Sequence, residues 1–235
     1  MSYRVTAATI TLVLAIGAQS QGDRPAIVPI NAVRVGHVKS GSVALQDFIN
    51  QMSANTHVAF CIENRGNAMR TTLGSLSVNL NVGPNDDLRA VLTRLEQTLP
   101  VVKWTTEAGI VVISSNDIKD DPLDAVIKPS TFEGTVRDFV AFLNSQAPGL
   151  MADTLEISGM YDRKAVYRLD FKSEVRVREA LSALTRDYGV RWNATIRDEG
   201  ALVQVPGGTD GKPTEVRTGR VTLMFSRGPV PLLVR

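Results

Sequence analysis

The sequence predicts an α+β fold built from two tandem modules, each with two helices packed on short sheets. Three observations predict it: four amphipathic helical patterns, alternating apolar segments typical of strands, and the return of both after about 90 residues. The chain of 235 residues is 43% apolar and 21% charged, which is typical of a folded globular protein. We therefore expect βαββαββ-type modules over residues 21–117 and 128–206, with a linker at 118–127.

Residues 1–20 have the pattern of a secretory signal peptide. Arg4 supplies a positive charge, residues 5–17 are mostly apolar, and Ala18-Gln19-Ser20 resembles a small-residue cleavage site. An uncleaved membrane anchor is the alternative, but this stretch contains three threonines and is shorter than the ~20 residues that span a bilayer. We expect cleavage near Ser20, a periplasmic or secreted protein, and no membrane span after cleavage.

The first helix of each module has one apolar face with the same spacing. Apolar residues recur at i, i+3, i+4 and i+7, and the second set follows the first by 91 positions. Ser42 is the expected N-cap of the first helix, and Thr135 with Asp138 predicts a capping box for its counterpart. The two apolar sets are Leu45, Phe48, Ile49 and Met52, and Val136, Phe139, Val140 and Leu143.

An alternating strand and a second helix recur together, displaced by 89 positions. The strands are expected at 76–82 and 165–171, each with one face on a core. Asn85, Asp86 and Asp87 place a capping residue and negative charge at the start of the first of these helices. The apolar helix positions are Leu88, Val91, Leu92, Leu95 and Leu99, and Val177, Ala180, Leu181, Leu184 and Tyr188.

A β-hairpin is expected to close each module. Residues 101–104 and 110–113 flank a turn ending in Gly109, and residues 190–192 and 201–203 flank a turn ending in Gly200. Trp104 and Trp192, the two tryptophans of the chain, occupy equivalent places in the two hairpins. An aromatic side chain on a sheet face next to a helix favours a core anchor over a ligand-stacking role.

Charged and flexible segments separate and follow the modules. Residues 116–122 end in a proline and predict a solvated linker that includes Asp117, Asp120 and Asp121. Residues 207–235 are expected to form a flexible linker and a C-terminal strand or tail, the flexible composition beginning at Pro206. This tail either adds a strand to the second module or pairs with the sheet edge of a partner.

Candidate catalytic and metal-binding residues are sparse. Cys61 is predicted to be a small buried strand residue, and His57 on the same strand would lie about 13 Å from it, too far for a nucleophile–base pair. His37 could approach Cys61 only through folding. Two histidines and one cysteine make no metal cluster, and scattered charges with a net +2 argue against nucleic-acid binding. We expect no enzymatic activity, no cofactor and no bound metal.

The module order resembles the STN domain found at the N-termini of secretins and TonB-dependent transducers. Residues 42–49 with 76–112 carry the resemblance, and residues 135–140 with 165–203 carry it again. It implies helices on small sheets, a periplasmic location and protein–protein contact. We therefore expect a cell-envelope interaction module, associated with secretin or TonB-dependent systems, whose envelope protein partner is unidentified. A small-ligand or glycan binder using a cleft between the modules is the alternative. The sequence leaves the binding residues and the oligomeric state open.

Overall fold

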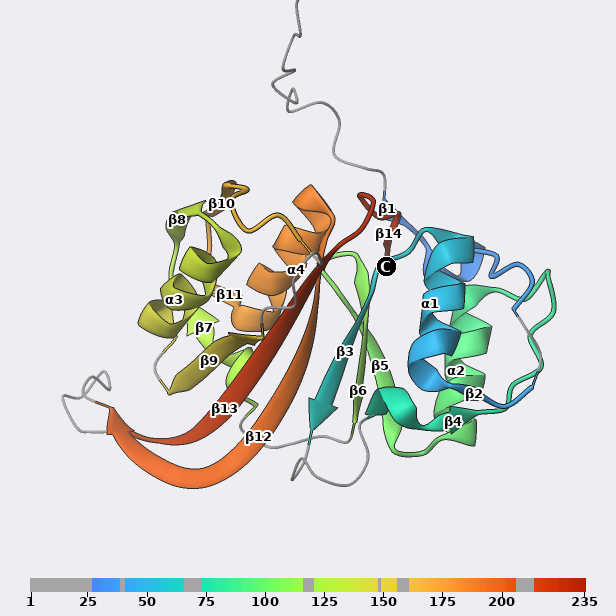
Figure 1. Cartoon of the computed structure of the whole chain (residues 1–235), viewed down its shortest axis with the longest axis horizontal. Coiled ribbons are helices and arrows are strands. Elements are labelled where there is room, and N and C mark those ends of the chain that lie inside the picture. The colour runs from blue at the N-terminus through green and yellow to red at the C-terminus, as the bar shows by residue number, and fades with distance from the viewer. Residues whose placement is uncertain are drawn as a thin grey trace, which may run out of the picture.

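The predicted α+β class is confirmed by four helices, a mixed six-stranded sheet and smaller two-stranded sheets (Figure 1). The computed structural model describes residues 27–38, 41–65, 73–115, 121–147, 149–155, 161–205 and 214–235. The predicted signal peptide and the part of the predicted flexible linker at residues 206–213 lie outside the described residues. Among the described residues, no helix is long and apolar enough to cross a membrane.

All four predicted helices are present and bury the expected apolar faces, with Leu99 and Tyr188 only partly buried at their ends. Thr135 and Asp138 form the predicted capping box, and Asp87 caps its helix by accepting a hydrogen bond from the backbone of Ala90. The helices are α1 (Leu45–Thr56), α2 (Leu88–Thr98), α3 (Val136–Gln146) and α4 (Val177–Tyr188).

The prediction of Ser42 as the N-cap of α1 is wrong. Ala44 is the N-cap and has no side-chain cap, because the short strand β2 (Val43–Ala44) runs directly into the helix. The backbone N–H of Leu45 donates to the carbonyl of Leu76, so a strand neighbour satisfies this helix end. The Ser42 hydroxyl instead hydrogen-bonds the hydroxyl of Ser77.

The six-stranded sheet repeats one three-stranded plan. In each half a hairpin is extended by a parallel strand, giving the orders β5-β6-β3 and β12-β13-β9. Parallel pairing of β3 with β12 joins the halves into one sheet. The strands are β5 (Val102–Glu107), β6 (Ile110–Ser115), β3 (Phe60–Arg65), β12 (Val190–Val205), β13 (Thr214–Arg227) and β9 (Leu150–Leu155).

The second hairpin differs from its prediction. The first is confirmed as β5 and β6, but β12 is a single strand of 16 residues that passes through the expected turn at Gly200. Its hairpin partner is β13, and the register shifts between Asp198 and Leu202. Gly200 therefore marks an irregularity within a long strand instead of a turn. β13, which lies in the predicted C-terminal tail, pairs with β12 and β9 inside the sheet. This agrees with the interpretation in which the tail adds a strand to the second module.

Four two-stranded sheets are also present among the described residues. The predicted strand at 165–171 is present as β10 with alternating burial, whereas the one at 76–82 is paired only over β4, because its partner β2 ends where α1 begins. The pairs are β2 with β4 (Ser77–Val78), β8 (Ser130–Gly134) with β10 (Tyr167–Phe171), β7 (Val126–Ile127) with β11 (Val175–Arg176), and β1 (Ile27–Val28) with β14 (Leu233–Val234). Short 3-10 helices are η1 (Ile30–Ala32), η2 (Leu73–Ser75) and η3 (Pro122–Asp124).

Two hydrophobic cores lie on opposite faces of the sheet, with α1 and α2 over one and α3 and α4 over the other (Figure 1). Strand β3 contributes to both, since Ile62 points to the α1–α2 core and Cys61 to the other. Trp192 is fully buried and Trp104 is half-buried against the α1–α2 core. The predictions of tryptophan core anchors and of a buried Cys61 are confirmed.

The C-terminal segment forms backbone hydrogen bonds with three parts of the chain that are distant in sequence. Leu232 and Val234 donate backbone hydrogen bonds to the carbonyls of His57 and Gly109, each at 2.8 Å, and Arg235 donates to Val28 at 3.1 Å. Gly109 stands at φ +92°, and a Cβ added there would lie 2.9 Å from the Cβ of Leu233. The tail is therefore packed against the β5–β6 turn with no room for a larger residue.

Gly109→Ala should destabilise the fold more than Gly41→Ala. Both glycines have positive φ, so alanine is strained at either position, but an added Cβ meets nothing within 4 Å at Gly41. The clash at Gly109 should add about 1–3 kcal/mol to the loss of unfolding free energy, measured by urea denaturation. Equal losses in the two variants would show that the tail does not pack on this turn.

Candidate functional site

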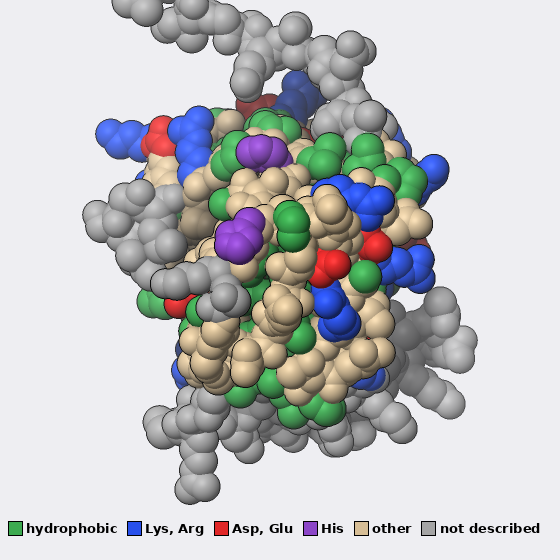
Figure 2. All heavy atoms as spheres, turned by 90° about the vertical axis from the view of Figure 1, so that its right-hand side faces the viewer, with side chains coloured by type: hydrophobic (Ala, Val, Ile, Leu, Met, Phe, Trp, Pro, Cys, Tyr) green, Lys and Arg blue, Asp and Glu red, His purple; other side chains and the backbone are tan. Residues whose placement is uncertain are grey.

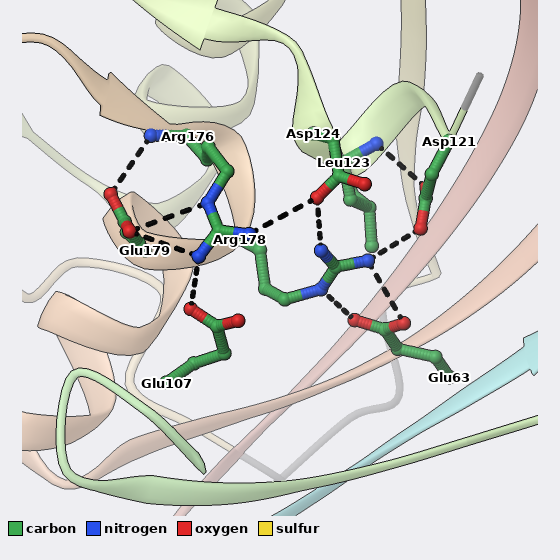
Figure 3. Close-up of polar contacts among 8 residues, drawn as sticks. All are labelled: Glu63, Glu107, Asp121, Leu123, Asp124, Arg176, Arg178 and Glu179. Atoms are coloured by element: carbon green, nitrogen blue, oxygen red, sulfur yellow. Dashed lines mark hydrogen bonds and ion pairs between the residues drawn. The ribbon is translucent and has the colours of Figure 1, made fainter. Parts of the chain in front are cut away.

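A buried ion-pair cluster lies where the two predicted modules meet (Figure 3). Arg178, near the start of α4, binds Glu63 of β3 with both oxygens, at 2.6 Å from Nε and 3.2 Å from Nη2. Its remaining donors reach Asp121, the N-cap of η3, and Asp124, the last residue of η3. The Arg178 side chain is 7% exposed and that of Glu63 is fully buried. One guanidinium thus joins β3, the segment between the modules, and α4.

Local structure explains how Asp121 reaches this cluster. Asp121 is the N-cap of η3: its Oδ1 accepts a hydrogen bond from the backbone of Leu123 at 2.9 Å, and Pro122 occupies the first helical position. Its second oxygen faces Arg178. The prediction that Asp121 belongs to a solvated linker is wrong, because its side chain is only 2% exposed. Asp117 and Asp120 lie outside the described residues.

A second arginine extends the cluster to the first hairpin. Arg176 donates to Glu107, the last residue of β5, at 2.8 Å and to Glu179 at 3.1 Å, and lies 3.6 Å from Asp124 (Figure 3). Glu179 also accepts a hydrogen bond from the backbone of Arg176 at 3.1 Å. The start of α4 is therefore tied to the β5–β6 turn as well as to β3.

The cluster is dominated by carboxylates, because five of them surround two arginines. Burial opposes the charge of Arg178, but its hydrogen bonds with Glu63 and the charges of Glu63, Asp121 and Asp124 outweigh that effect and raise its pKa. Burial also raises the pKa of the Glu107 carboxyl above its usual range, although the charges of Arg176 and Arg178 oppose the rise.

These groups are suited to holding elements together. A guanidinium neither accepts nor releases a proton near neutral pH, and each arginine here is already engaged by carboxylates. The cluster occupies the junction where a ligand-binding cleft was the alternative prediction. Its geometry supports a fixed arrangement of the two halves.

The cysteine and histidines do not form a reactive pair. Cys61 is buried in the α3–α4 core, and burial, more than any charge around it, raises the pKa of its thiol to about 12. This keeps the thiol protonated and a poor nucleophile. His57 is exposed at the end of α1, and the carbonyl of exposed His37 accepts a hydrogen bond from Asn55. Histidine side chains lie at the surface of the α1–α2 face (Figure 2). Within the described ranges no group of three or more potential ligands could hold a metal.

Strand β5 leaves one end of the six-stranded sheet open. Ala108 and Gly109, at φ +48° and +92°, form a two-residue turn, so Glu107 and Ile110 are a hydrogen-bonded pair. Hydrogen-bonded and non-hydrogen-bonded positions alternate along β5, so Thr106 and Trp104 direct their backbone N–H and C=O groups away from β6. These groups have no hydrogen-bond partner in the part of the chain that the structure describes. We call them the free edge of β5.

Two hydrogen bonds confirm this assignment. Val111 lies opposite Thr106 and donates its N–H away from β5, to the carbonyl of Ala59 just before β3, at 3.0 Å. Opposite residues in such a pair both direct their groups away from each other, so Thr106 points outward as well. Val102, which has the same orientation as Trp104, donates its outward N–H to the carbonyl of Leu99 at 2.8 Å. The outward N–H of Val102 is therefore satisfied locally, and the unpaired outward groups begin at Trp104 and continue at Thr106.

Strand β9, at the opposite end of the sheet, is covered at Leu150 and Ala152. The side-chain amide of Asn144 on α3 donates to the carbonyl of Ala152 and accepts from its N–H, both at 2.8 Å. The N–H of Leu150 donates to the carbonyl of Ala147 at 3.1 Å. Side-chain and loop groups thus occupy the positions that an added strand would need, a recognised protection of edge strands.

Comparison with known proteins identifies no relative. No protein-family model matches the chain, and neither a curated protein nor a solved structure matches it. The resemblance to the STN domain and the division at residues 21–117 and 128–206 therefore stay predictions.

Arg178→Met should lower the free energy of unfolding by about 3–5 kcal/mol, because it leaves Glu63 and Asp121 buried without their arginine. Arg94→Met is the matched control: it removes the pair with Asp86, whose side chains are 40% and 33% exposed, and should cost at most about 1 kcal/mol. Urea denaturation measures both. A similar small cost for the two variants would contradict the role given to the cluster.

Glu107 and Asp138 should give opposite pH dependences of stability. The native pKa of Glu107 is raised, so its contribution is complete below its unfolded-state pKa and is lost as the pH rises through the native pKa. Hydrogen bonds from Thr135 lower the pKa of Asp138, so its contribution is present above the unfolded-state pKa and is lost as the pH falls. Between about pH 3 and about pH 7, a rise in pH should lower the free energy of unfolding of the unaltered chain relative to that of Glu107→Gln. The same rise in pH should increase the free energy of unfolding of the unaltered chain relative to that of Asp138→Asn. Urea midpoints measure this, and equal signs would contradict it.

Proposed function

We propose that the chain is an exported cell-envelope protein that acts through protein–protein contact, with the free edge of β5 as its docking site. The observation that carries the proposal is the pair of residues Trp104 and Thr106, whose outward backbone groups are unpaired among the described residues. An extended segment of another protein can pair with such groups and lengthen the sheet.

The repeat supplies a precedent for this use of the edge. Strand β12 occupies in the second half the place of β5 in the first, and Trp192 corresponds to Trp104. The equivalent edge of β12 is paired with β3 over three residues, from Ala194 opposite Glu63 to Ile196 opposite Arg65. The same edge of the same module therefore already accepts a strand inside this chain.

The surroundings of β5 suit a docking site. The Arg176–Glu107 ion pair at 2.8 Å holds the end of the strand, and Trp104 packs on the α1–α2 core, so the edge is fixed before a partner arrives. Val101, directly before the strand, is 45% exposed and offers apolar surface. The signal peptide predicted at residues 1–20 supports an envelope location, and association with a secretin or TonB-dependent system rests on the STN resemblance.

Thr106→Pro tests the docking edge, because proline removes the outward N–H without touching the bonds between β5 and β6. A photo-crosslinking residue at exposed Thr105 should capture a protein chain in the native envelope, and Thr106→Pro should abolish that crosslink. Thr106→Ala, which keeps the N–H, should preserve it. Thermal unfolding should show all variants folded.

Crosslinks that persist in the folded Thr106→Pro variant would contradict docking at this edge. So would the absence of any protein crosslink from Thr105 in the native envelope.

A further inference from the structure

We infer that the strand docked on β5 is β5 of a second copy of this chain, paired antiparallel about a twofold axis at Thr105. The inference rests on the proposed docking edge and names its partner. It follows from the backbone register of β5, the charges along it, and the protection of the opposite edge of the sheet.

The backbone of β5 is self-complementary in this register. With Thr105 facing Thr105 of the second copy, Trp104 lies opposite Thr106 of that copy and Thr106 opposite its Trp104. These are the two residues whose N–H and C=O groups point outward. Each such pair exchanges two hydrogen bonds, so four form across the axis, and no outward group at these positions is left unpaired.

The side chains agree with this register. Lys103 lies opposite Glu107 of the second copy, in a non-hydrogen-bonded pair where Cβ atoms approach to about 4.5–5.5 Å, and the twofold axis repeats this contact. Residues 103, 105 and 107 share the face of β5 next to α4, where Arg176 already holds Glu107. Exposed Val101 lies beside the Ala108–Gly109 turn of the other copy.

Other arrangements of two copies are less favourable. Parallel in-register pairing of two β5 strands would set Lys103 beside Lys103 and Glu107 beside Glu107, which like-charge repulsion disfavours. Head-to-tail pairing of β5 with β9 would require the edge that Asn144 covers through Ala152. The twofold arrangement uses only the open edge and closes on itself.

A cysteine at the axis tests the register. The full chain, exported with its own signal and purified, should sediment as a dimer that dissociates on dilution. Thr105→Cys should form a disulfide-linked dimer under mild oxidation, because the two Cβ atoms face each other in a non-hydrogen-bonded pair. Thr106→Cys is the matched control: its two copies lie diagonally, about 7–8 Å apart, and should link poorly. Cys61 is fully buried and does not compete.

A charge reversal tests the side-chain contacts. Lys103→Glu should raise the dimer dissociation constant roughly tenfold, because both symmetric contacts with Glu107 become repulsive. Lys128→Glu makes the same charge change at an exposed position after β7 and should leave it unchanged. Sedimentation velocity over a range of concentrations measures both.

The results separate this inference from the proposed function. A monomer at every concentration, a dimer insensitive to Thr106→Pro, or equal linking of the two cysteine variants would overturn the twofold β5 pairing. If the Thr105 crosslinker in the envelope captures a different protein in a Thr106→Pro-sensitive way, the docking edge stands and the second copy is excluded. Loss of any such crosslink would remove both.

Discussion

The bidentate pairing of Arg178 with Glu63 is the interaction on which the arrangement of the two halves depends. Within the six-stranded sheet the backbone contact between them is short, since β3 and β12 pair over three residues and the side chain of Asn193 accepts one further hydrogen bond from Ile62. Arg178 adds a direct bond from α4 to β3 and draws in Asp121 and Asp124. A buried ion pair of this kind adds little net stability compared with apolar packing, but a wrong alignment would leave several charges buried and unpaired. We expect it to specify the alignment of the halves.

The elements that the sequence predicts well are those whose information is local. The four helices follow from apolar spacing, and the caps at Thr135 and Asp87 follow from a hydroxyl or carboxylate at the right distance from a backbone N–H. The second hairpin could not be predicted, because the partner of β12 lies beyond residues 206–213 and Gly200 gives the same local signal for a bulge as for a turn. In the repeated three-stranded plan of the sheet, β13 is the counterpart of β6.

The ion-pair cluster shows why site residues were missed. Its members come from β3, β5, β11, η3 and α4, and from Asp121 at the N-cap of η3; their convergence is a property of the assembled fold. Two local signals do exist. Glu63 directly follows an apolar strand run, and Arg176 and Arg178 stand at the start of a helix, where the helix dipole disfavours positive charge. Such residues predict carboxylate partners, although they do not say which ones.

The repeated three-stranded plan explains why an edge is left open. Each three-stranded unit has two edges, formed by β3 and β5 in the first half and by β9 and β12 in the second. Joining the halves consumes β3 and β12 and leaves β5 and β9. The chain covers β9 with Asn144, whose amide imitates a strand, and has no equivalent cover among the described residues for Trp104 and Thr106. Since an unprotected edge invites pairing, this asymmetry supports the proposal that a strand of a second copy pairs with β5.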